Sequence, residues 1–232
     1  LVANPEIAKL SALGQKSADV ECTLRLLYPP RVTAMQGRYN GLGCYGWEES
    51  RLDSDYVKQF NQHLQFTTTM SNYVTRTLQD NGVTCPLFTV GIGADHILRA
   101  EPNSKDLPKL PDALRLLHIS SCFPRKGVDV LLETYGRAFS SADEVCLIIK
   151  TFANTHHDIE QQLEVWRATL AKPPAIVLIN QDISESAIRA LYQAADVLVA
   201  PSRGEGFGLP MAEAMLRNTP FNYTLSREAI FK

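Results

Sequence analysis

The chain has 232 residues, of which 45% are hydrophobic and 21% charged, a balance typical of globular proteins with a buried core. The 23 Lys and Arg against 25 Asp and Glu give a formal net charge of -2, which argues against nucleic-acid binding. The longest apolar runs, such as 145–149, fall far short of the ~20 residues that cross a bilayer. The five cysteines contain no C-x-x-C pair, so we expect a reducing cytoplasmic compartment and no metal site.

The first hundred residues carry a weak α/β signal. Strands are predicted at 22–28, 64–69 and 87–90, and Ser71 is expected to cap a helix that ends near residue 78. Residues 100–112 contain three prolines and few apolar side chains, which is typical of a linker. We therefore predict two domains, residues 1–109 and residues 110–232.

A regular alternation of strands and helices begins at residue 114. The predicted strands are continuous apolar runs rather than alternating ones, which indicates a parallel sheet covered on both faces. Such a βαβα series predicts a doubly wound sheet. The strands are expected at 114–119, 145–150, 176–179 and 196–200, and the helices at 128–139, 158–170, 185–194 and 210–216.

The ends of the chain have the character of a fragment. The sequence begins at Leu1 without a methionine, and residues 218–232 predict neither a helix nor a strand. We therefore expect a chain that is truncated at both ends.

Residues 202–213, with the sequence SRGEGFGLPMAE, join a predicted strand to a predicted helix. Glycines let backbone amides approach a ligand closely, and a helix N-terminus favours phosphate. Glu205 and Glu213 would then border one pocket, where two carboxylates suit a ligand with two diols, such as a nucleotide sugar. The alternative is a simple glycine turn with Glu213 on the surface.

Residues 118–127, with the sequence HISSCFPRKG, follow the strand at 114–119. Lys126 is expected at the carboxyl end of that strand, where its compact cation suits a diphosphate. The alternative is a solvated pair of Arg125 and Lys126 at a helix start, where cations are slightly unfavourable.

These two segments resemble the C-terminal, nucleotide-sugar-binding domain of the retaining glycosyltransferases of family 4. The matching residues are 124–132 (PRKGVDVLL), the strand end at 195–202 and the Glu205-to-Glu213 motif. The first half looks like the end of the acceptor-side domain, through 47–49 and 90–95. The resemblance implies a GT-B-like, Rossmann-like α/β fold of two units.

The resemblance also implies roles for individual residues. Lys126 would hold the donor diphosphate, Glu205 would contact the donor sugar, and Glu213 would accept hydrogen bonds from the ribose. No metal or other cofactor is implied. The substrate-binding positions further include Arg125, Ser120, Ser121, Gly206, Phe207, Gly208 and Leu209.

The sequence departs from the family pattern in three ways. Family members commonly carry an arginine five or six positions before the lysine, where this chain has Ser121 and Ser120. Either Arg125 replaces that arginine or the diphosphate is held with one cation fewer. The glycine loop and catalytic histidine of the acceptor domain are not recognisable, and neither are the elements expected after the helix at 210–216. We therefore expect the fragment to lack some catalytic parts, and an inactive form stays open.

Several other residues are weaker candidates. Residues 47–49 (WEE) follow a glycine-rich stretch and would face the acceptor or simply pack. Lys150 would add to the phosphate field or be a solvated residue at a strand end. His118 and Cys122 are expected to be structural rather than reactive.

The leading hypothesis is a glycosyltransferase that uses a nucleotide-sugar donor and a saccharide or lipid-linked acceptor in bacterial polysaccharide biosynthesis. A cytoplasmic location is expected, with peripheral association at the inner face of the membrane left open. The alternative is a noncatalytic module that binds a nucleoside diphosphate. A dinucleotide-dependent oxidoreductase is disfavoured because no G-x-G-x-x-G follows an early strand.

Overall fold

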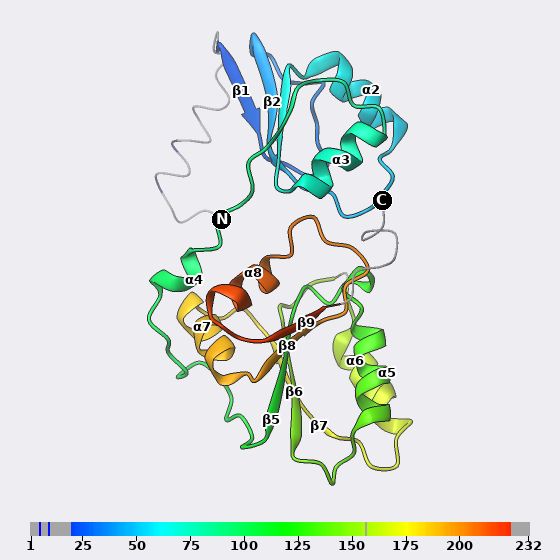
Figure 1. Cartoon of the computed structure of the whole chain (residues 1–232), viewed down its shortest axis with the longest axis vertical. Coiled ribbons are helices and arrows are strands. Elements are labelled where there is room, and N and C mark those ends of the chain that lie inside the picture. The colour runs from blue at the N-terminus through cyan, green and yellow to red at the C-terminus, as the bar shows by residue number, and fades with distance from the viewer. Residues whose placement is uncertain (1–4, 6–8, 10–19, 156, 224–232) are drawn as a thin grey trace. The chain divides into compact units, whose positions relative to one another are not determined.

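The computed structural model describes residues 5, 9, 20–155 and 157–223. The chain divides into two compact units, each built around one parallel sheet (Figure 1). Unit 1 comprises Leu1–Gly46 and Arg51–Gly91, and unit 2 comprises Trp47–Ser50 and Ile92–Lys232. The two-unit parallel α/β architecture predicted from the sequence is therefore confirmed.

Unit 1 has a four-stranded sheet in the order β1-β2-β3-β4, in which every neighbouring pair is parallel. Ser71 caps the second of its helices, as the sequence predicts, because its hydroxyl accepts from the Val74 amide at 3.3 Å. The elements are β1 (Cys22–Arg25), β2 (Tyr39–Tyr45), α2 (Ser54–His63), β3 (Phe66–Thr69), α3 (Asn72–Asp80) and β4 (Leu87–Thr89).

The sequence analysis missed β2 and α2 of this unit. Strand β2 contains two glycines, which weaken a strand pattern, but a side chain at Gly41 would overlap the Phe66 ring on β3. Helix α2 begins after Asp53, whose carboxylate accepts from the Asp55 amide, and it buries Phe60 completely. The apolar face of α2 is narrow, which explains why periodicity alone did not reveal it.

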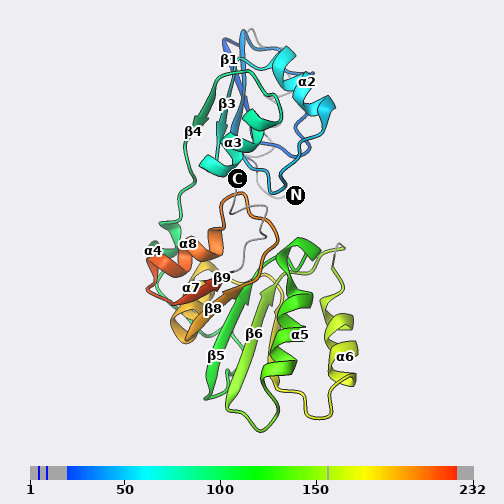
Figure 2. The same cartoon turned by 45° about the vertical axis from the view of Figure 1, so that its right-hand side comes forward.

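Unit 2 has a five-stranded parallel sheet in the order β7-β6-β5-β8-β9. The apolar core lies on both faces of this sheet, under α5 and α6 on one face and under α4, α7 and α8 on the other (Figure 2). The strands are β5 (Leu114–Ile119), β6 (Val145–Thr151), β7 (Ala175–Asn180), β8 (Val197–Ala200) and β9 (Phe221–Tyr223). The helices are α4 (His96–Arg99), α5 (Val128–Ala138), α6 (Ile159–Ala168), α7 (Glu185–Ala194) and α8 (Leu209–Leu216).

The predicted strands and helices from residue 114 onward match these elements to within two residues at each end. Strand β6 is buried along its whole length, which accounts for its continuous apolar run. Strand β9 was not predicted, because three residues are too few to show a period. Residues 224–232, also expected to lack a clear pattern, lie outside the described residues.

The division between the units falls at Gly91–Ile92 and not near residue 110. Helix α4 explains the difference, because Ile97 is 1% exposed and belongs to the core of unit 2. Leu107 and Leu110 pack against the same core, so the proline-rich stretch is attached to unit 2 rather than forming a linker. Arg189 on α7 adds a hydrogen bond of 2.9 Å to the Leu98 carbonyl oxygen.

Two loops meet at the carboxyl ends of β5 and β8. The backbone amide of Arg203 donates to the carbonyl oxygen of Arg125 at 2.7 Å. The Arg203 guanidinium also donates two hydrogen bonds to the Asp129 carboxylate, at 2.9 and 2.7 Å. At Gly127, with φ of +71°, a Cβ atom would overlap the carbonyl oxygen of Pro201. The loops therefore approach as closely as backbone atoms permit.

The Gly127→Ala substitution should therefore destabilise unit 2 severely. Left-handed backbone costs a non-glycine residue about 1 kcal/mol, and the overlap with Pro201 should bring the total to roughly 3 kcal/mol or more. Gly91→Ala is the matched control, because Gly91 has a φ of +70° and open space where the Cβ would lie. Urea unfolding of both variants measures the difference, and equal losses would contradict the close approach.

Candidate functional site

The strand order of unit 2 reverses between β5 and β8, because β6 and β7 follow β5 on one side while β8 and β9 lie on the other. In open parallel α/β sheets, ligands bind at such a switch point, outside the carboxyl ends of the strands. The loop 120–127 follows β5, and the loop 201–208 follows β8. Both predicted motifs are therefore brought to one place by the topology of the sheet.

Lys126, from the loop after β5, and Glu205, from the loop after β8, form an ion pair. The Lys126 Nζ atom lies 2.5 Å from the Glu205 Oε1 atom, and both side chains are about seven-eighths buried, with exposures of 12% and 13%. The hydroxyl of Ser202, itself buried, donates to the same carboxylate oxygen at 2.7 Å. One oxygen of Glu205 thus receives two donors, which orient the carboxylate within the loop.

The environment of this pair is poorly solvated. Burial lowers the pKa of the Lys126 ammonium, and the Glu205 carboxylate offsets part of that effect. Removing one member of such a pair leaves an uncompensated charge, which typically costs about 3–5 kcal/mol when the pair is fully buried. Lys126 and Glu205 therefore depend on each other for charge compensation in this poorly solvated part of unit 2.

A chain of hydrogen bonds beginning at His118 shapes the loop after β5. The His118 Nδ1 atom lies 2.8 Å from the Val199 carbonyl oxygen, so this nitrogen carries the hydrogen. The Nε2 atom then accepts from the Ser120 hydroxyl at 2.8 Å, and that hydroxyl accepts from the Cys122 amide at 3.0 Å. This chain holds Cys122 at a φ of +53°.

His118 is therefore the structural residue that the sequence predicts. It is 1% exposed, and burial lowers its pKa to about 4. Cys122 is 4% exposed, and burial raises the pKa of its thiol, which agrees with inert packing. The Ser120 hydroxyl is engaged in hydrogen bonds to His118 and Cys122, within the same segment.

The predicted positions Ser121 and Arg125 have different surroundings. The Ser121 hydroxyl oxygen is buried and has no hydrogen-bond partner among the described residues. Arg125 Nη2 lies 3.0 Å from the Glu48 carboxylate, while its Nη1 atom is buried without a partner in the same described part. Residues 47–49, a weak candidate from the sequence, therefore reach the loop through Glu48.

The segment 206–209 forms the entrance to helix α8. Gly208 is the N-cap, with a φ of +81°, and no side chain caps the helix there. The helix begins at Leu209, so Pro210 is its second residue and not its first. Gly206 and Gly208 are buried, and the Phe207 and Leu209 side chains are half-buried. The backbone at this helix start thus follows directly after Glu205 in the sequence.

Glu213 is not a surface residue, so the alternative in which it only interacts with solvent is wrong. Its residue exposure is 7%, and each of its carboxylate oxygens has a donor. The Oε1 atom lies 2.9 Å from the Nε2 atom of His96 on α4. The Oε2 atom accepts from the hydroxyl of Tyr192 on α7 at 2.7 Å.

Lys150 is buried, whereas a lysine at the end of a strand is commonly solvated. It is 6% exposed at the end of β6, and its ammonium donates to the Thr151 carbonyl oxygen at 2.8 Å. Burial lowers its pKa, and the Asp182 carboxylate opposes that shift.

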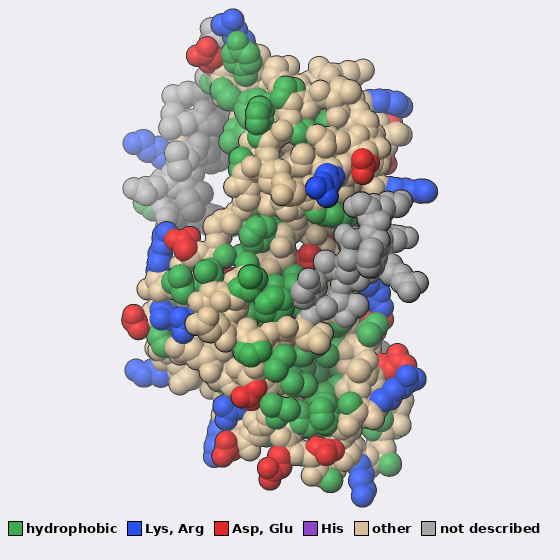
Figure 3. All heavy atoms as spheres, in the orientation of Figure 1, with side chains coloured by type: hydrophobic (Ala, Val, Ile, Leu, Met, Phe, Trp, Pro, Cys, Tyr) green, Lys and Arg blue, Asp and Glu red, His purple; other side chains and the backbone are tan. Residues whose placement is uncertain are grey.

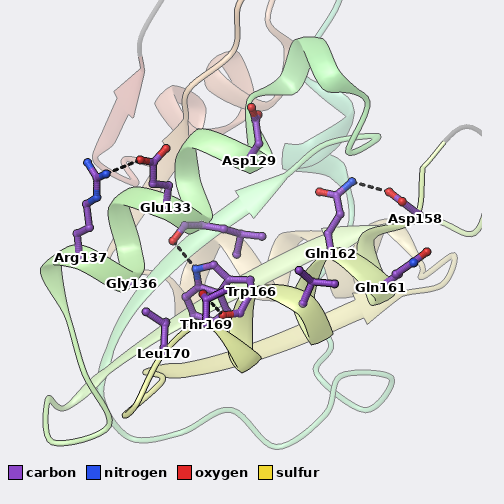
Figure 4. A pocket seen from close by; sticks show the side chains of 12 residues that line it. Asp129, Glu133, Gly136, Arg137, Asp158, Gln161, Gln162, Trp166, Thr169 and Leu170 are labelled. Atoms are coloured by element: carbon purple, nitrogen blue, oxygen red, sulfur yellow. Dashed lines mark hydrogen bonds and ion pairs between the residues drawn. The ribbon is translucent and has the colours of Figure 1, made fainter.

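A groove of about 540 Å³ lies between α5 and α6, with the Trp166 ring and Leu170 among its lining (Figure 4). None of the predicted site residues lines it. The Trp166 indole donates to the Leu132 carbonyl oxygen at 2.8 Å, which fixes the ring against α5. This groove is separate from the candidate site.

Charged side chains of both signs are mixed over the described part of the face in Figure 3, as the net charge of -2 would suggest. Within residues 20–155 and 157–223, no three His, Cys, Asp or Glu side chains gather in a way that would hold a metal ion. No helix in the described part of the chain is long and apolar enough to cross a membrane.

Sequence reasoning missed four residues that complete these contacts. Ser202 and Arg203 lie inside the recognised motif, but their partners are set by the folded loop. Tyr192 lies within the predicted helix at 185–194, but only the folded structure brings its hydroxyl to Glu213. His96 lies 117 positions from Glu213, so no local pattern connects the two residues.

Comparisons with known proteins point in one direction. Residues 113–224 match the family model described as Glycosyl transferases group 1. A protein of Sulfolobus islandicus rod-shaped virus 1, named as an uncharacterized glycosyltransferase, is 25% identical over 118 residues, or 50% of this chain and 32% of that protein.

Solved structures share the fold of the whole chain at low sequence identity. A glycosyltransferase from Rickettsia africae ESF-5 has a TM-score of 0.68 at 18% identity, with 100% of this chain and 66% of that chain covered. An α,α-trehalose-phosphate synthase (UDP-forming) from Burkholderia xenovorans, in complex with glucose-6-phosphate, has a TM-score of 0.68 at 16% identity, with coverages of 96% and 61%.

The pneumococcal O-GlcNAc transferase GtfA, in complex with UDP and GlcNAc, has a TM-score of 0.56 at 15% identity. The match covers 80% of this chain and 37% of that chain. This chain therefore has the GT-B fold of these glycosyltransferases but spans less than two thirds of each relative.

The buried His118 should make the stability of the protein depend on pH. In the unfolded chain the imidazole takes up a proton below its ordinary pKa of 6.5, whereas in the folded protein it stays neutral down to about pH 4. Stability is therefore complete above pH 6.5 and falls as the pH drops, with His118 contributing about 2 kcal/mol of loss between pH 7.5 and pH 5.

Urea unfolding of the wild type and of His118→Asn at these two pH values measures this contribution. The variant should be less stable at pH 7.5, because the bond to Ser120 is lost, but it should lose about 2 kcal/mol less on acidification. Equal losses in the two proteins would show that His118 is not buried in its neutral form.

Proposed function

We propose that this chain is the donor-binding part, with some of the acceptor-side part, of a glycosyltransferase that uses a nucleoside-diphosphate sugar. The observation that carries the proposal is the Lys126–Glu205 pair, buried between the two loops at the reversal of strand order. A cation held beside a carboxylate at such a position matches a ligand that has both a diphosphate and sugar hydroxyls.

In the proposed reaction, the bond between the anomeric carbon of the sugar and the diphosphate oxygen breaks. The diphosphate leaves with the bonding electrons, and an acceptor hydroxyl forms the new bond on the same face while it passes its proton to the departing diphosphate oxygen. The Lys126 ammonium would offset the charge that builds on the diphosphate, which requires no metal ion in this proposal. Retention of the anomeric configuration follows from the resemblance to family 4.

The other predicted residues would surround the donor. Glu205 would accept hydrogen bonds from sugar hydroxyls once the diphosphate has taken over Lys126. The backbone of 206–209, at the uncapped start of α8, would donate to the sugar and phosphate oxygens. Glu213 would accept from the ribose. Arg125 and Ser121 each have a buried polar atom without a partner among the described residues, so both have capacity left for the diphosphate.

The acceptor is proposed to be a saccharide or a lipid-linked saccharide in bacterial polysaccharide biosynthesis. This would place the enzyme in the cytoplasm, with a peripheral position at the membrane if the acceptor is lipid-linked. The trehalose-phosphate synthase among the structural relatives keeps a phosphorylated sugar open as the acceptor. The alternative function is a noncatalytic module that binds nucleoside diphosphates through the same two loops.

Calorimetric titration with UDP, GDP, ADP and CMP, first without metal and then with magnesium, tests the proposal directly. One nucleoside diphosphate should bind without metal, which would also identify the donor class. If none binds to a sample shown to be folded by circular dichroism, the proposal fails. Release of sugar from the matching nucleotide sugar, with and without acceptor, then separates the enzyme from the noncatalytic module.

Lys126→Met should weaken binding of the nucleoside diphosphate far more than binding of its parent nucleoside. Loss of a charge-assisted contact to phosphate should cost roughly 10- to 100-fold in affinity for the diphosphate, with less than a threefold change for the nucleoside. The double variant Lys126→Met, Glu205→Gln guards against unfolding, because it removes both charges of the pair. Equal losses for both ligands would show that Lys126 does not contact the phosphates.

Glu205→Gln and Glu213→Gln should separate the roles of the two carboxylates. Glu213→Gln should reduce nucleoside-diphosphate affinity by about tenfold, because an amide accepts at only one of its two terminal atoms. Glu205→Gln should change that affinity less than threefold and instead slow sugar release or transfer. Titration and turnover of both variants measure this, and equal losses of affinity would contradict the assignment.

A further inference from the structure

Glu213 is held from two sides by residues of other helices. His96 is the first residue of α4, Tyr192 lies near the end of α7, and Glu213 belongs to α8. The three helices lie on the same face of the sheet in unit 2 (Figure 1). A carboxylate that accepts hydrogen bonds from two other helices has a fixed orientation, in contrast to one that projects into solvent.

The Tyr192 hydroxyl is a permanent donor to this carboxylate. The residue is 1% exposed, and its burial together with the Glu213 charge raises its pKa well above the ordinary value of 10, so the phenol stays protonated. The hydroxyl also lies 3.2 Å from the Pro210 carbonyl oxygen. Its single hydrogen favours the charged acceptor, because the Glu213 oxygen is nearer, at 2.7 Å.

The His96 imidazole holds the other oxygen. Since a carboxylate oxygen only accepts, the Nε2 atom of His96 must carry the hydrogen over the 2.9 Å between them. The His96 side chain is 37% exposed, whereas the Glu213 side chain is 9% exposed, so the contact joins a partly exposed donor to a largely buried acceptor.

The two donors leave part of the carboxylate unused. An ionised carboxylate has about four lone-pair positions, and the contacts to His96 and Tyr192 take one on each oxygen. One further position remains on each oxygen, and two adjacent acceptors match the two adjacent hydroxyls of a ribose. Rotation of the carboxylate would break a contact with one helix or the other.

We propose that His96 and Tyr192 are positioning residues that fix the Glu213 carboxylate so that it recognises the 2′,3′-diol of a nucleotide. This inference rests on the proposed function and extends it to the choice between ribonucleotides and deoxyribonucleotides. Neither residue needs to touch the nucleotide, because both act through the orientation of Glu213.

The test compares binding of ribonucleoside and 2′-deoxyribonucleoside diphosphates to Tyr192→Phe and His96→Leu, each of which removes the donor to Glu213. The calorimetric probes are the pairs UDP and dUDP, GDP and dGDP, and ADP and dADP. The wild type should prefer one ribonucleotide over its deoxy counterpart. Each variant should lose about tenfold in affinity for the ribonucleotide and less than threefold for the deoxynucleotide, so that the preference collapses.

Two matched substitutions control for general effects. Tyr135→Phe removes another buried hydroxyl from unit 2, one that donates to the Ala175 carbonyl oxygen at 2.8 Å. His63→Leu removes a half-buried histidine from α2 in unit 1. Both should keep the wild-type preference for the ribonucleotide, because neither residue contacts Glu213.

The outcomes separate this inference from the proposed function. If the wild type binds no nucleoside diphosphate, both fail. If Glu213→Gln abolishes the ribonucleotide preference while Tyr192→Phe and His96→Leu keep it, the function stands and the positioning role is overturned. A parallel loss for ribo- and deoxynucleotides in a folded variant also overturns it. Should Tyr192→Phe fail to fold, His96→Leu decides, since the His96 side chain is more exposed.

Discussion

The close approach of two loops above β5 and β8 is the constraint on which the candidate site depends. Gly127 allows the loop after β5 to touch the Pro201 carbonyl, and the Arg203–Asp129 ion pair fastens the second loop to α5. Only with the loops at this separation can Lys126 reach Glu205. The constraint in turn follows from the sheet order, which makes β5 and β8 neighbours although many residues separate them along the chain.

Burial sets the electrostatic character of the site. Lys126, Glu205 and Glu213 are each largely withdrawn from solvent, so each charge requires partners supplied by the protein. The carboxylates of Glu205 and Glu213 have different hydrogen-bond partners. Glu205 shares one oxygen between an ammonium and a hydroxyl, while Glu213 divides its oxygens between an imidazole and a phenol. A carboxylate beside a cation suits exchange with an anionic ligand, and one oriented by neighbouring helices suits recognition of hydroxyls.

The agreement between sequence and structure differs between the two units for physical reasons. In unit 2, the fully buried β6 and the capped α7 leave clear apolar patterns, so their ends were predicted closely. In unit 1, β2 was hidden by glycines that the Phe66 ring requires. The domain boundary was misplaced because a proline-rich composition suggested a linker, whereas Ile97 and the residues after it pack into unit 2.

By itself, the sequence determined the parallel α/β architecture, the placement of Lys126 and Glu205 in loops after strands, and that of Glu213 in the following helix, because periodicity and glycine spacing are local properties. Only the tertiary structure decided which side chains pair with these charged groups. His96 meets Glu213 across 117 positions, and Glu48 meets Arg125 from a segment before the first strand of unit 2. The contacts of Glu213 depend on how α4, α7 and α8 pack against the sheet, and no local pattern in the sequence encodes that packing.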